Sequence, residues 1–315
     1  MPVNPQKNSP RSKSDKLVRW SFLATTTIPF LIVVVVIIVL IIKTLPILQY
    51  QSIWQLLTGR SWHPTKGEFG FYPFITGTFW VTFVAMILAV PPCLLTAIYL
   101  VEYAHASTRA FMKPLLDLLS GIPSVVYGVW GMIAIVPWVQ KVIAPFFNKW
   151  LGFIPFFAVN NPTGFSILSG SIVLAVMVVP LIIAVSYEVM HAVPDGLREA
   201  SMAIGATKWQ TIRKCVIPKA LPGIIAATVL GFSRAFGETM AVLMVVGNVP
   251  KVPGSIFDPA YPLTALIANN YGEMLSIPLY DAALLGAALV LLLIVLVFNV
   301  LSALVLIHIV GRPAR

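Results

Sequence analysis

Long runs of apolar residues dominate the chain. Residues 31–42 include no polar position, and residues 282–307 are interrupted only by small or weakly polar side chains. With its flanks, each run reaches the roughly 20 residues that a helix needs to cross the hydrocarbon core of a bilayer. Hydropathy predicts further spans near residues 74–100, 115–139, 166–187 and 220–246. The pattern therefore predicts about six transmembrane helices.

The composition changes this picture only by excluding a soluble protein. Of the 315 residues, 58% are apolar and 10% are charged, and the mean hydropathy is +0.91. Soluble domains carry about a quarter of charged residues. We therefore predict an all-α integral membrane protein.

The first apolar run is interpreted as a retained membrane anchor and not as a secretory signal. Its apolar run is too long, and residues 43–46 offer no small-residue cleavage site. The predicted organisation is a basic tail (1–20), a first transmembrane helix (21–43), an extracytoplasmic loop (44–73), a membrane core (74–310) that includes the polar loop 194–218, and a second tail (311–315).

The distribution of Lys and Arg predicts the orientation. Most of the 21 basic residues fall in the N-terminal tail, around Arg109 and Lys113, in residues 198–219 and in the C-terminal tail. Because cytoplasmic segments carry the excess of Lys and Arg, we expect a multi-pass protein with both ends in the cytoplasm. The same bias accounts for most of the formal net charge of +10, so the charge does not indicate a nucleic-acid partner.

Motifs for enzymatic chemistry are absent from the sequence. Residues 205–208 place a lysine after a glycine but lack the second glycine and the hydroxyl of a phosphate-binding loop. Cys93, Cys215 and the four His residues are scattered, with neither metal-ligand spacing nor a disulfide framework. We therefore predict no metal, no cofactor bound by this chain and no enzymatic activity of its own.

The first half of the 194–218 loop has the pattern of a short amphipathic helix. Pro194 suits a first helical position, and Leu197, Ser201 and Ile204 fall on one face at helical spacing. Gly205 is expected to end this helix.

The second half predicts another short helix, because Thr207 has the character of an N-cap and Gln210 follows three residues later. From local physics, the whole loop is either a docking element or an interfacial helix. In the second case Arg198, Lys208 and their basic neighbours would bind anionic lipid.

The loop resembles a known element. Glu199, Ala200, Gly205 and the Ile-Pro pair at 217–218 look like the EAA loop of ABC importer permeases, although Ser201 stands where that family usually has Ala. The resemblance implies type I ABC importer permease architecture, with a cytoplasmic coupling helix. It also implies that Glu199, Ala200 and Gly205 dock into a separate ATPase.

Three further stretches narrow the resemblance. Residues 99–103 (YLVEY), 121–128 (GIPSVVYG) and 234–242 (RAFGETMAV) are similar to phosphate-specific (Pst) importer permeases. Residues 62–74 and the basic tail look more like the PstC-type subunit than like its PstA-type partner, and the similarity covers nearly all of the chain from residue 62 on.

What this resemblance implies is a transport subunit in a bacterial plasma (inner) membrane. It would import inorganic phosphate by alternating access, together with a second, PstA-like permease. Two copies of a PstB-like ATPase would use Mg-ATP inside the cell, and a PstS-like binding protein would deliver phosphate outside.

Arg234 and Glu238 are charged residues inside the predicted span 220–246. A charged side chain at the centre of a span costs at least about 2.5 kcal/mol on insertion scales. Their spacing predicts one helix face, shared with a strip of small residues at 223, 227 and 231 that permits close helix approach. They form either a structural ion pair or part of a substrate path. In the path, Arg234 would bind phosphate transiently, and Glu238 would hold Arg234 and weaken its grip.

Gly121 and Pro123 interrupt the third predicted span, because proline removes a backbone hydrogen bond and disfavours helix at the preceding residue. The interruption is either a static kink or a hinge near the path.

Two rival functions stay open: a permease for molybdate or sulfate, and a secondary anion transporter driven by ion gradients.

Overall fold

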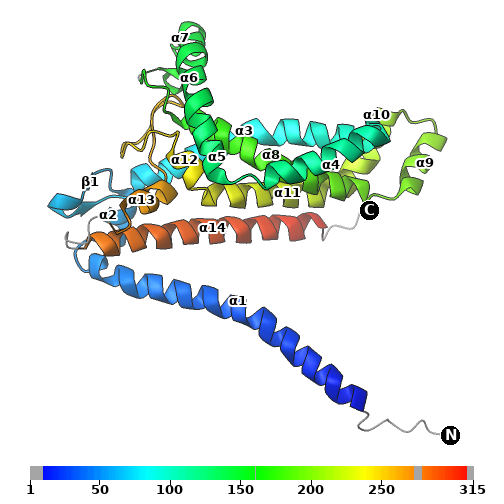
Figure 1. The fold of residues 1–315 in the computed structure, drawn as a ribbon, viewed down its shortest axis with the longest axis horizontal. Coiled ribbons are helices and arrows are strands. Elements are labelled where there is room, and N and C mark those ends of the chain that lie inside the picture. Colours follow the sequence, from blue (N-terminus) through cyan, green and yellow to red (C-terminus); the bar gives the residue numbers. More distant parts are fainter. Residues whose placement is uncertain (1–9, 160, 273–278, 311–315) are drawn as a thin grey trace.

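The computed structural model describes residues 10–159, 161–272 and 279–310, which are mostly helical (Figure 1). The expected C-terminal tail and the first part of the basic N-terminal tail, with Lys7, lie outside the described residues. The all-α prediction is confirmed, since the strands of the described part are limited to one small hairpin.

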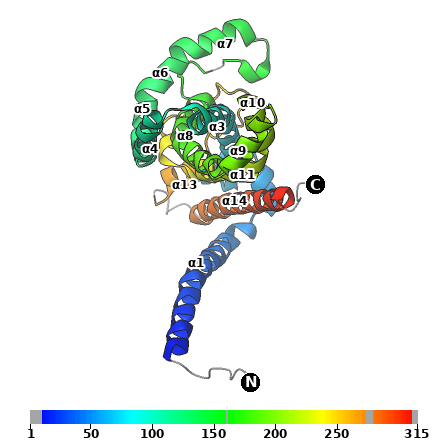
Figure 2. The ribbon, with the colours of Figure 1, turned by 90° about the vertical axis from the view of Figure 1, so that its right-hand side faces the viewer.

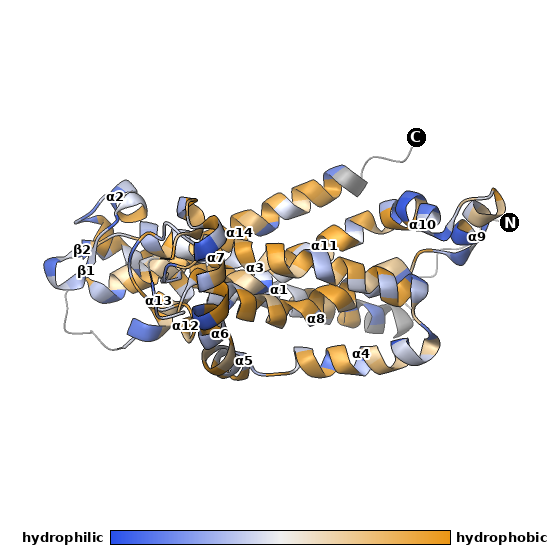
Figure 3. Ribbon diagram, turned by 90° about the horizontal axis from the view of Figure 1, so that it is seen from above, coloured by the Kyte–Doolittle hydropathy of each residue, from blue (hydrophilic) through white to orange (hydrophobic). Residues whose placement is uncertain are grey.

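Six helical stretches of the described chain are long and apolar enough to cross a membrane, which confirms the number predicted from hydropathy. They are Leu17–Leu48, Tyr72–Tyr103, Ser124–Leu151, Ile167–His191, Lys208–Gly237 and Tyr280–His308. Figure 3 shows that apolar residues cover most of their length.

Three helices form the core of the bundle: α3 (Tyr72–Ile98), α8 (Ile167–His191) and α11 (Ile217–Gly237). Helix α8 lies at the centre, and its Val173, Leu174, Val178 and Ile182 side chains are fully buried. Helix α3 continues into a π-helical turn, η2 (Tyr99–Tyr103). Because α8 is apolar all round and surrounded by neighbours, it is the buried axis on which the other helices pack.

Two long helices lie at the edge of the bundle. Helix α14 (Tyr280–Val310) packs along α11, and α1 (Pro10–Leu48) contacts α14 near one end and then diverges from it (Figures 1 and 2). The apolar side chains of α1 are mostly exposed, for example Phe30 at 70%. A helix with this surface is suited to lipid or to another membrane subunit.

The third predicted span is broken completely. Helix α4 (Ala106–Ser120) lies along α8 and ends before Gly121, and a new helical run then projects away from the bundle (Figure 1). That run consists of α5 (Ser124–Trp130), η3 (Gly131–Ile135), α6 (Val136–Trp138), η4 (Val139–Ile143) and α7 (Ala144–Leu151). The predicted interruption is confirmed in position, but it separates two helices where a kink would bend one.

One end of the bundle, the hairpin end, carries the short elements. They are α2 (Ile53–Thr58), β1 (Trp62–His63), η1 (Pro64–Lys66), β2 (Glu68–Phe69), η5 (Pro155–Phe157), α12 (Met240–Leu243) and α13 (Leu263–Asn270). Strands β1 and β2 pair antiparallel, with Trp62 opposite Phe69. The Trp62 ring contacts those of Phe69, Phe74 and Tyr280 at centroid distances of 5.1–6.1 Å. This aromatic cluster joins the hairpin to α3 and α14.

The opposite end, the loop end, carries the 194–218 loop. Its helices are α9 (Asp195–Ala203), α10 (Lys208–Thr211) and the π-helical turn η6 (Ile212–Val216), which continues into α11. In Figures 1 and 3, α9 lies beyond the ends of the core helices. The 194–218 loop therefore projects beyond the helix bundle and does not lie across its end.

Candidate functional site

The first candidate region is the end of α11. The sequence predicts a continuous span 220–246 with both charged residues inside it. The structure contradicts this, because the helix ends at Gly237 and Glu238 is extended, with φ −71° and ψ 126°. Arg234 lies in the last turn of α11, and Glu238 lies outside the helix. They do not share a helix face.

Glu238 holds the break in place. Its carboxylate accepts a hydrogen bond from the backbone N–H of Ala241 (3.1 Å), at the start of α12. Its backbone carbonyl accepts one from the Thr264 hydroxyl of α13 (3.0 Å). Within the described chain, no ion pair joins Glu238 to Arg234. The alternative of a structural ion pair is therefore wrong, and so is the expectation that Glu238 holds Arg234 in place, because the Glu238 carboxylate acts as a helix cap.

The strip of small residues packs as predicted. A Cβ atom at Gly231 would lie 2.8 Å from the Ile182 side chain of α8, and one at Gly223 would lie 2.2 Å from the Val189 side chain. The strip continues at Ala235, which is buried, so Arg234 lies beside it and is half-buried. Small residues bring α11 close to α8 and leave the Arg234 side chain at the edge of that contact.

The residues around Arg234 are fixed while its guanidinium is not. The Ser233 hydroxyl donates to the Asn299 side chain of α14 at 2.7 Å. The rings of Phe232 and Phe236 lie 4.9 and 5.6 Å from the Phe298 ring. Among the residues that the structure describes, none forms a hydrogen bond or ion pair with the Arg234 guanidinium. The helix is anchored on α14, and a cation with unused donors is left at its end.

The interruption at residues 121–123 lies near this end of α11. The Tyr127 hydroxyl donates to the Leu119 carbonyl at 2.8 Å and so bridges the two helices. A Cβ atom at the neighbouring Gly128 would lie 3.1 Å from the Ala241 Cα of α12, the helix that follows α11. Gly121 has φ −83°, a conformation open to any residue. The bend therefore depends on Pro123, the N-cap of α5, more than on the glycine.

The second candidate region is the 194–218 loop. Gly205 has φ +86°, the left-handed conformation that favours glycine, and it ends α9 as predicted. The capping box is confirmed: the Thr207 hydroxyl accepts from Gln210 N, and the Gln210 side chain accepts from Thr207 N. Pro194 is the N-cap of α9, one position before the expected first helical residue.

The loop has an exposed side and an inward side. Glu199 and Ala200 are exposed, and Ile204 is 86% exposed. The predicted face is divided, because Leu197 and Ile204 face outward while Ser201 forms a 2.9 Å hydrogen bond with Thr211 inside the loop. An exposed apolar tip on a projecting helix is suited to a partner protein.

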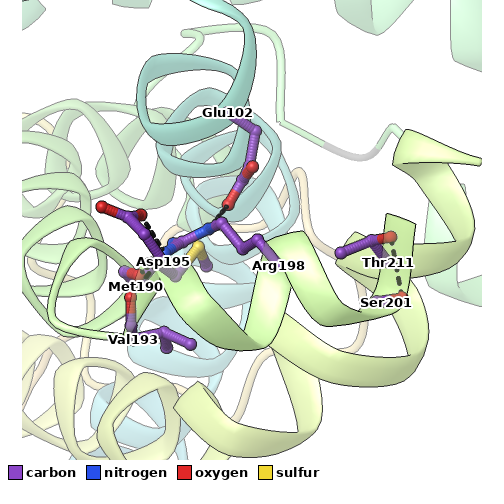
Figure 4. Close-up of polar contacts among 7 residues, drawn as sticks. All are labelled: Glu102, Met190, Val193, Asp195, Arg198, Ser201 and Thr211. Carbon is purple, nitrogen blue, oxygen red and sulfur yellow. Dashed lines mark hydrogen bonds and ion pairs between the residues drawn. The ribbon is translucent and has the colours of Figure 1, made fainter. Parts of the chain in front are cut away.

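Arg198 joins α9 to the core (Figure 4). Its Nε donates to Glu102 at 3.1 Å, and its Nη atoms donate to the Asp195 carboxylate and to the backbone carbonyls of Met190 and Val193. The side chain of Arg198 is 13% exposed and that of Glu102 8%. This corrects the alternative in which Arg198 binds lipid headgroups, because four of its five N–H donors are already used inside the protein.

A second contact joins the other half of the loop to the core. The Lys208 ammonium lies 4.7 Å from the centre of the Tyr103 ring, a cation–π contact. Sequence reasoning missed the roles of Glu102 and Tyr103, although both lie in the 99–103 stretch that carried part of the family resemblance.

Metal-binding geometry is not seen in the described part of the chain, which has no group of three or more His, Cys, Asp or Glu side chains placed to hold an ion. The two described cysteines, buried Cys93 and partly exposed Cys215, are free thiols.

Residues 93–312 match the family described as "Binding-protein-dependent transport system inner membrane component". The "Probable ABC transporter permease protein YqgH" of Bacillus subtilis is 39% identical over 78% of this chain and 75% of its own length. "Phosphate transport system permease protein PstC" of Pasteurella multocida is 35% identical (81% of this chain, 80% of its own), and that of Haemophilus influenzae is 31% identical (91% and 92%).

Solved structures share the fold at lower identity. A bacterial ABC transporter involved in import of the acidic polysaccharide alginate aligns with a TM-score of 0.59 at 18% identity, over 93% of this chain and 97% of the other. The MetNI methionine ABC transporter in an inward-facing conformation gives 0.51 at 21% identity, over 76% and 94%. The fold is thus that of an ABC importer permease, and the chain belongs to the family of binding-protein-dependent transport system inner membrane components.

Proposed function

We propose that this chain is the PstC-type permease subunit of an ATP-driven importer of inorganic phosphate. The observation that carries the proposal is the half-buried guanidinium of Arg234 at the end of α11, whose donors no described residue uses, in a chain whose relatives include several named phosphate transport permeases.

Arg234 supplies the chemistry that phosphate recognition requires. A guanidinium offers paired N–H donors that match two phosphate oxygens. Because none of its described neighbours uses those donors, a passing anion meets an unpaired cation. Glu238 contributes by capping α12, which keeps the chain open directly after Arg234, and its negative charge limits how long the anion stays.

The 194–218 loop is the proposed ATPase contact. Glu199, Ala200 and Gly205 lie on the projecting α9 segment with the exposed Ile204. Two copies of an ATPase would bind this loop and its equivalent on a second, PstA-like permease. Mg-ATP would be used by those copies and not by this chain. Binding and hydrolysis would alternately open the path to each side of the membrane.

Orientation follows from the same assignment. The loop, the start of α1 and the end of α14 lie toward one end of the bundle (Figures 1 and 3). If the loop binds an ATPase in the cytoplasm, both chain ends are cytoplasmic, and the hairpin end faces a PstS-like binding protein outside a bacterial inner membrane. The break at Gly121 and Pro123 would be the hinge that responds when the path opens.

The test is uptake of radiolabelled phosphate into proteoliposomes that hold the chain with the second permease, the ATPase and the binding protein. We expect uptake only with Mg-ATP, and no change when ionophores collapse the ion gradients. Uptake without ATP would support a secondary transporter. Uptake of sulfate or molybdate in place of phosphate would overturn the assigned substrate.

The docking assignment has its own test. Ile204→Asp should reduce co-purification of the ATPase, because it places a charge at the exposed apolar tip of the loop. The matched control is Val252→Asp, which adds the same charge at an exposed apolar position (40%) outside the loop. Equal ATPase recovery from both variants would contradict the assignment.

A further inference from the structure

The turn η2 at the end of α3 contacts both helices of the 194–218 loop. Glu102 binds Arg198 of α9, and the adjacent Tyr103 lies under Lys208 of α10. Two neighbouring residues of one turn thus hold the two halves of the proposed ATPase contact. The turn is π-helical, a rare geometry that is frequent at functional sites.

Arg198 is held from three directions. One donor binds Glu102 on η2. Others bind the Met190 carbonyl in the last turn of α8 (3.0 Å) and the Val193 carbonyl just after that helix. A further bond goes to the Asp195 carboxylate at the start of α9 (3.0 Å). The carbonyls at the C-terminal end of α8 carry partial negative charge, which favours a cation there. Because the guanidinium is planar and its fork is rigid, movement of α9 relative to α3 would strain or break the Arg198–Glu102 contact.

Further contacts of α9 lie within the loop. The helix packs against α10 and η6, and the Ser201–Thr211 hydrogen bond also lies inside the loop. The Lys113–Glu188 ion pair is a different contact, joining α4 to α8. Through its ion pair with Glu102, Arg198 links α9 itself to η2 at the end of α3.

Helix α3 reaches from this contact to the Arg234 region. Near its other end, the Phe79 ring meets the Phe236 ring edge-on at 5.5 Å. Further along, Met86 Cε lies 3.4 Å from the position that a Cβ atom would take at Gly231. The same helix thus contacts the ATPase-facing loop at one end and the turn that carries Arg234 at the other.

We propose that the Arg198–Glu102 ion pair, with the Lys208–Tyr103 contact beside it, is the joint through which movement of the 194–218 loop reaches α3, so that α3 moves together with α11, which continues directly from the loop and carries Arg234. Glu102 and Arg198 are positioning residues in this scheme and do not touch the substrate. The proposal rests on the proposed function, because it requires that an ATPase moves the loop.

The test uses Glu102→Gln in the complete complex. Glutamine keeps the size and an acceptor oxygen, so Arg198 keeps its carbonyl contacts while the ion pair is lost. We expect ATPase co-purification to stay at the wild-type level, and phosphate imported per ATP hydrolysed to fall about tenfold, within the roughly 5- to 150-fold range of coupling between sites. Glu102→Asp, which restores the charge, should recover part of that ratio.

The matched control is Glu188→Gln, which breaks the exposed Lys113–Glu188 pair and should leave the ratio unchanged. An unchanged ratio in Glu102→Gln would overturn the joint. Loss of ATPase binding in Glu102→Gln and Glu102→Asp alike would also overturn it, since the pair would then only shape the docking surface. If the wild-type complex imports phosphate with ATP, the proposed function stands whichever result the variants give.

Discussion

Arg198 and Arg234 lie at opposite ends of one stretch of chain, and their guanidinium groups have opposite surroundings. Arg198 is 13% exposed and donates to two carboxylates and two helix-end carbonyls. Arg234 is half-buried and, within the described residues, donates to none. The residues flanking Arg234 are nevertheless anchored, by Ser233 on Asn299 and by Phe236 on Phe298.

The difference separates a cation that fixes structure from one that is available to a ligand. A buried ion that is already paired with carboxylates gains little from an added anion, and removing its partner is costly. A cation whose donors are unused in a largely apolar helix is expensive to keep, and such residues usually mark a transport path. Two arginines of one chain therefore have different roles, because their neighbours supply different hydrogen-bond acceptors.

The largest expected effect is on transport. Arg234→Gln should lower phosphate uptake about 100-fold or more, because losing paired charge-assisted hydrogen bonds costs about 3 kcal/mol. Assembly and thermal stability should stay close to wild type, since no described residue loses a partner. Uptake in proteoliposomes measures transport, and the melting temperature of the purified complex measures stability. Phosphate uptake by Arg234→Lys, which keeps the charge without the paired donors, should lie between that of wild type and that of Arg234→Gln. Normal uptake in Arg234→Gln would contradict the ligand-binding role that distinguishes Arg234 from Arg198.

The reverse pattern is expected at the other arginine. Arg198→Ala leaves the Glu102 carboxylate almost buried and unpaired, so the complex should lose about 3 kcal/mol of stability. Thermal unfolding of the purified complex is the measurement, and the exposed Lys113→Ala is the matched control with almost no change expected. If Arg198→Ala melted like wild type, Arg198 would not be a structural cation.

A smaller effect sharpens the description of the loop that Arg198 holds. Gly205→Ala places a Cβ at φ +86°, which should cost about 1–2 kcal/mol of loop stability. Gly196→Ala is the control, because Gly196 lies inside α9 with open space around it, and alanine there should stabilise by about 0.5–1 kcal/mol. Hydrogen exchange of the loop amides distinguishes the two, and equal exchange would contradict the predicted strain.

The smallest effect concerns the exposed ion pair at the same end. The hydrogen bond to Glu188 raises the pKa of Lys113 above its usual 10.5. Because the Lys113 pKa is higher in the folded protein than in the unfolded chain, the pair stabilises the fold fully at any pH below the unfolded-state pKa. This stabilisation is lost only as the pH rises through the folded-state pKa. Activity should therefore not respond to this pair between roughly pH 6 and 9. Labelled-lysine NMR should show a lower Lys113 pKa in Glu188→Gln, and an unchanged value would remove the pair as a factor.

Local sequence patterns predicted the local features. The six apolar spans, the Thr207 capping box, the end of α9 at Gly205 and the break before Pro123 each depend on residues within a few positions of one another. Their physics, which consists of burial, capping and the missing N–H of proline, is visible without a fold.

The missed features depend on residues that are far apart in the chain. Glu102 and Arg198 are separated by 96 positions, so no periodicity connects them. The end of α11 at Gly237 was missed because Glu238 caps α12 and is held by Thr264 of α13, which hydropathy does not record. The hairpin at 62–69 was also missed, since its strands are two residues long and are stabilised by aromatic contacts with distant helices.

The widened turn η2 has a consequence for the length of the chain at this point. An α-helix advances about 100° per residue, whereas a π-turn accommodates one residue more in a single turn. Deleting Tyr99, Leu100 or Val101, the residues of this turn that precede Glu102, would restore a regular helix and rotate the side chains that follow by about 100° around its axis. Glu102 would then point away from Arg198, so the number of residues in this segment is constrained as strictly as their identity.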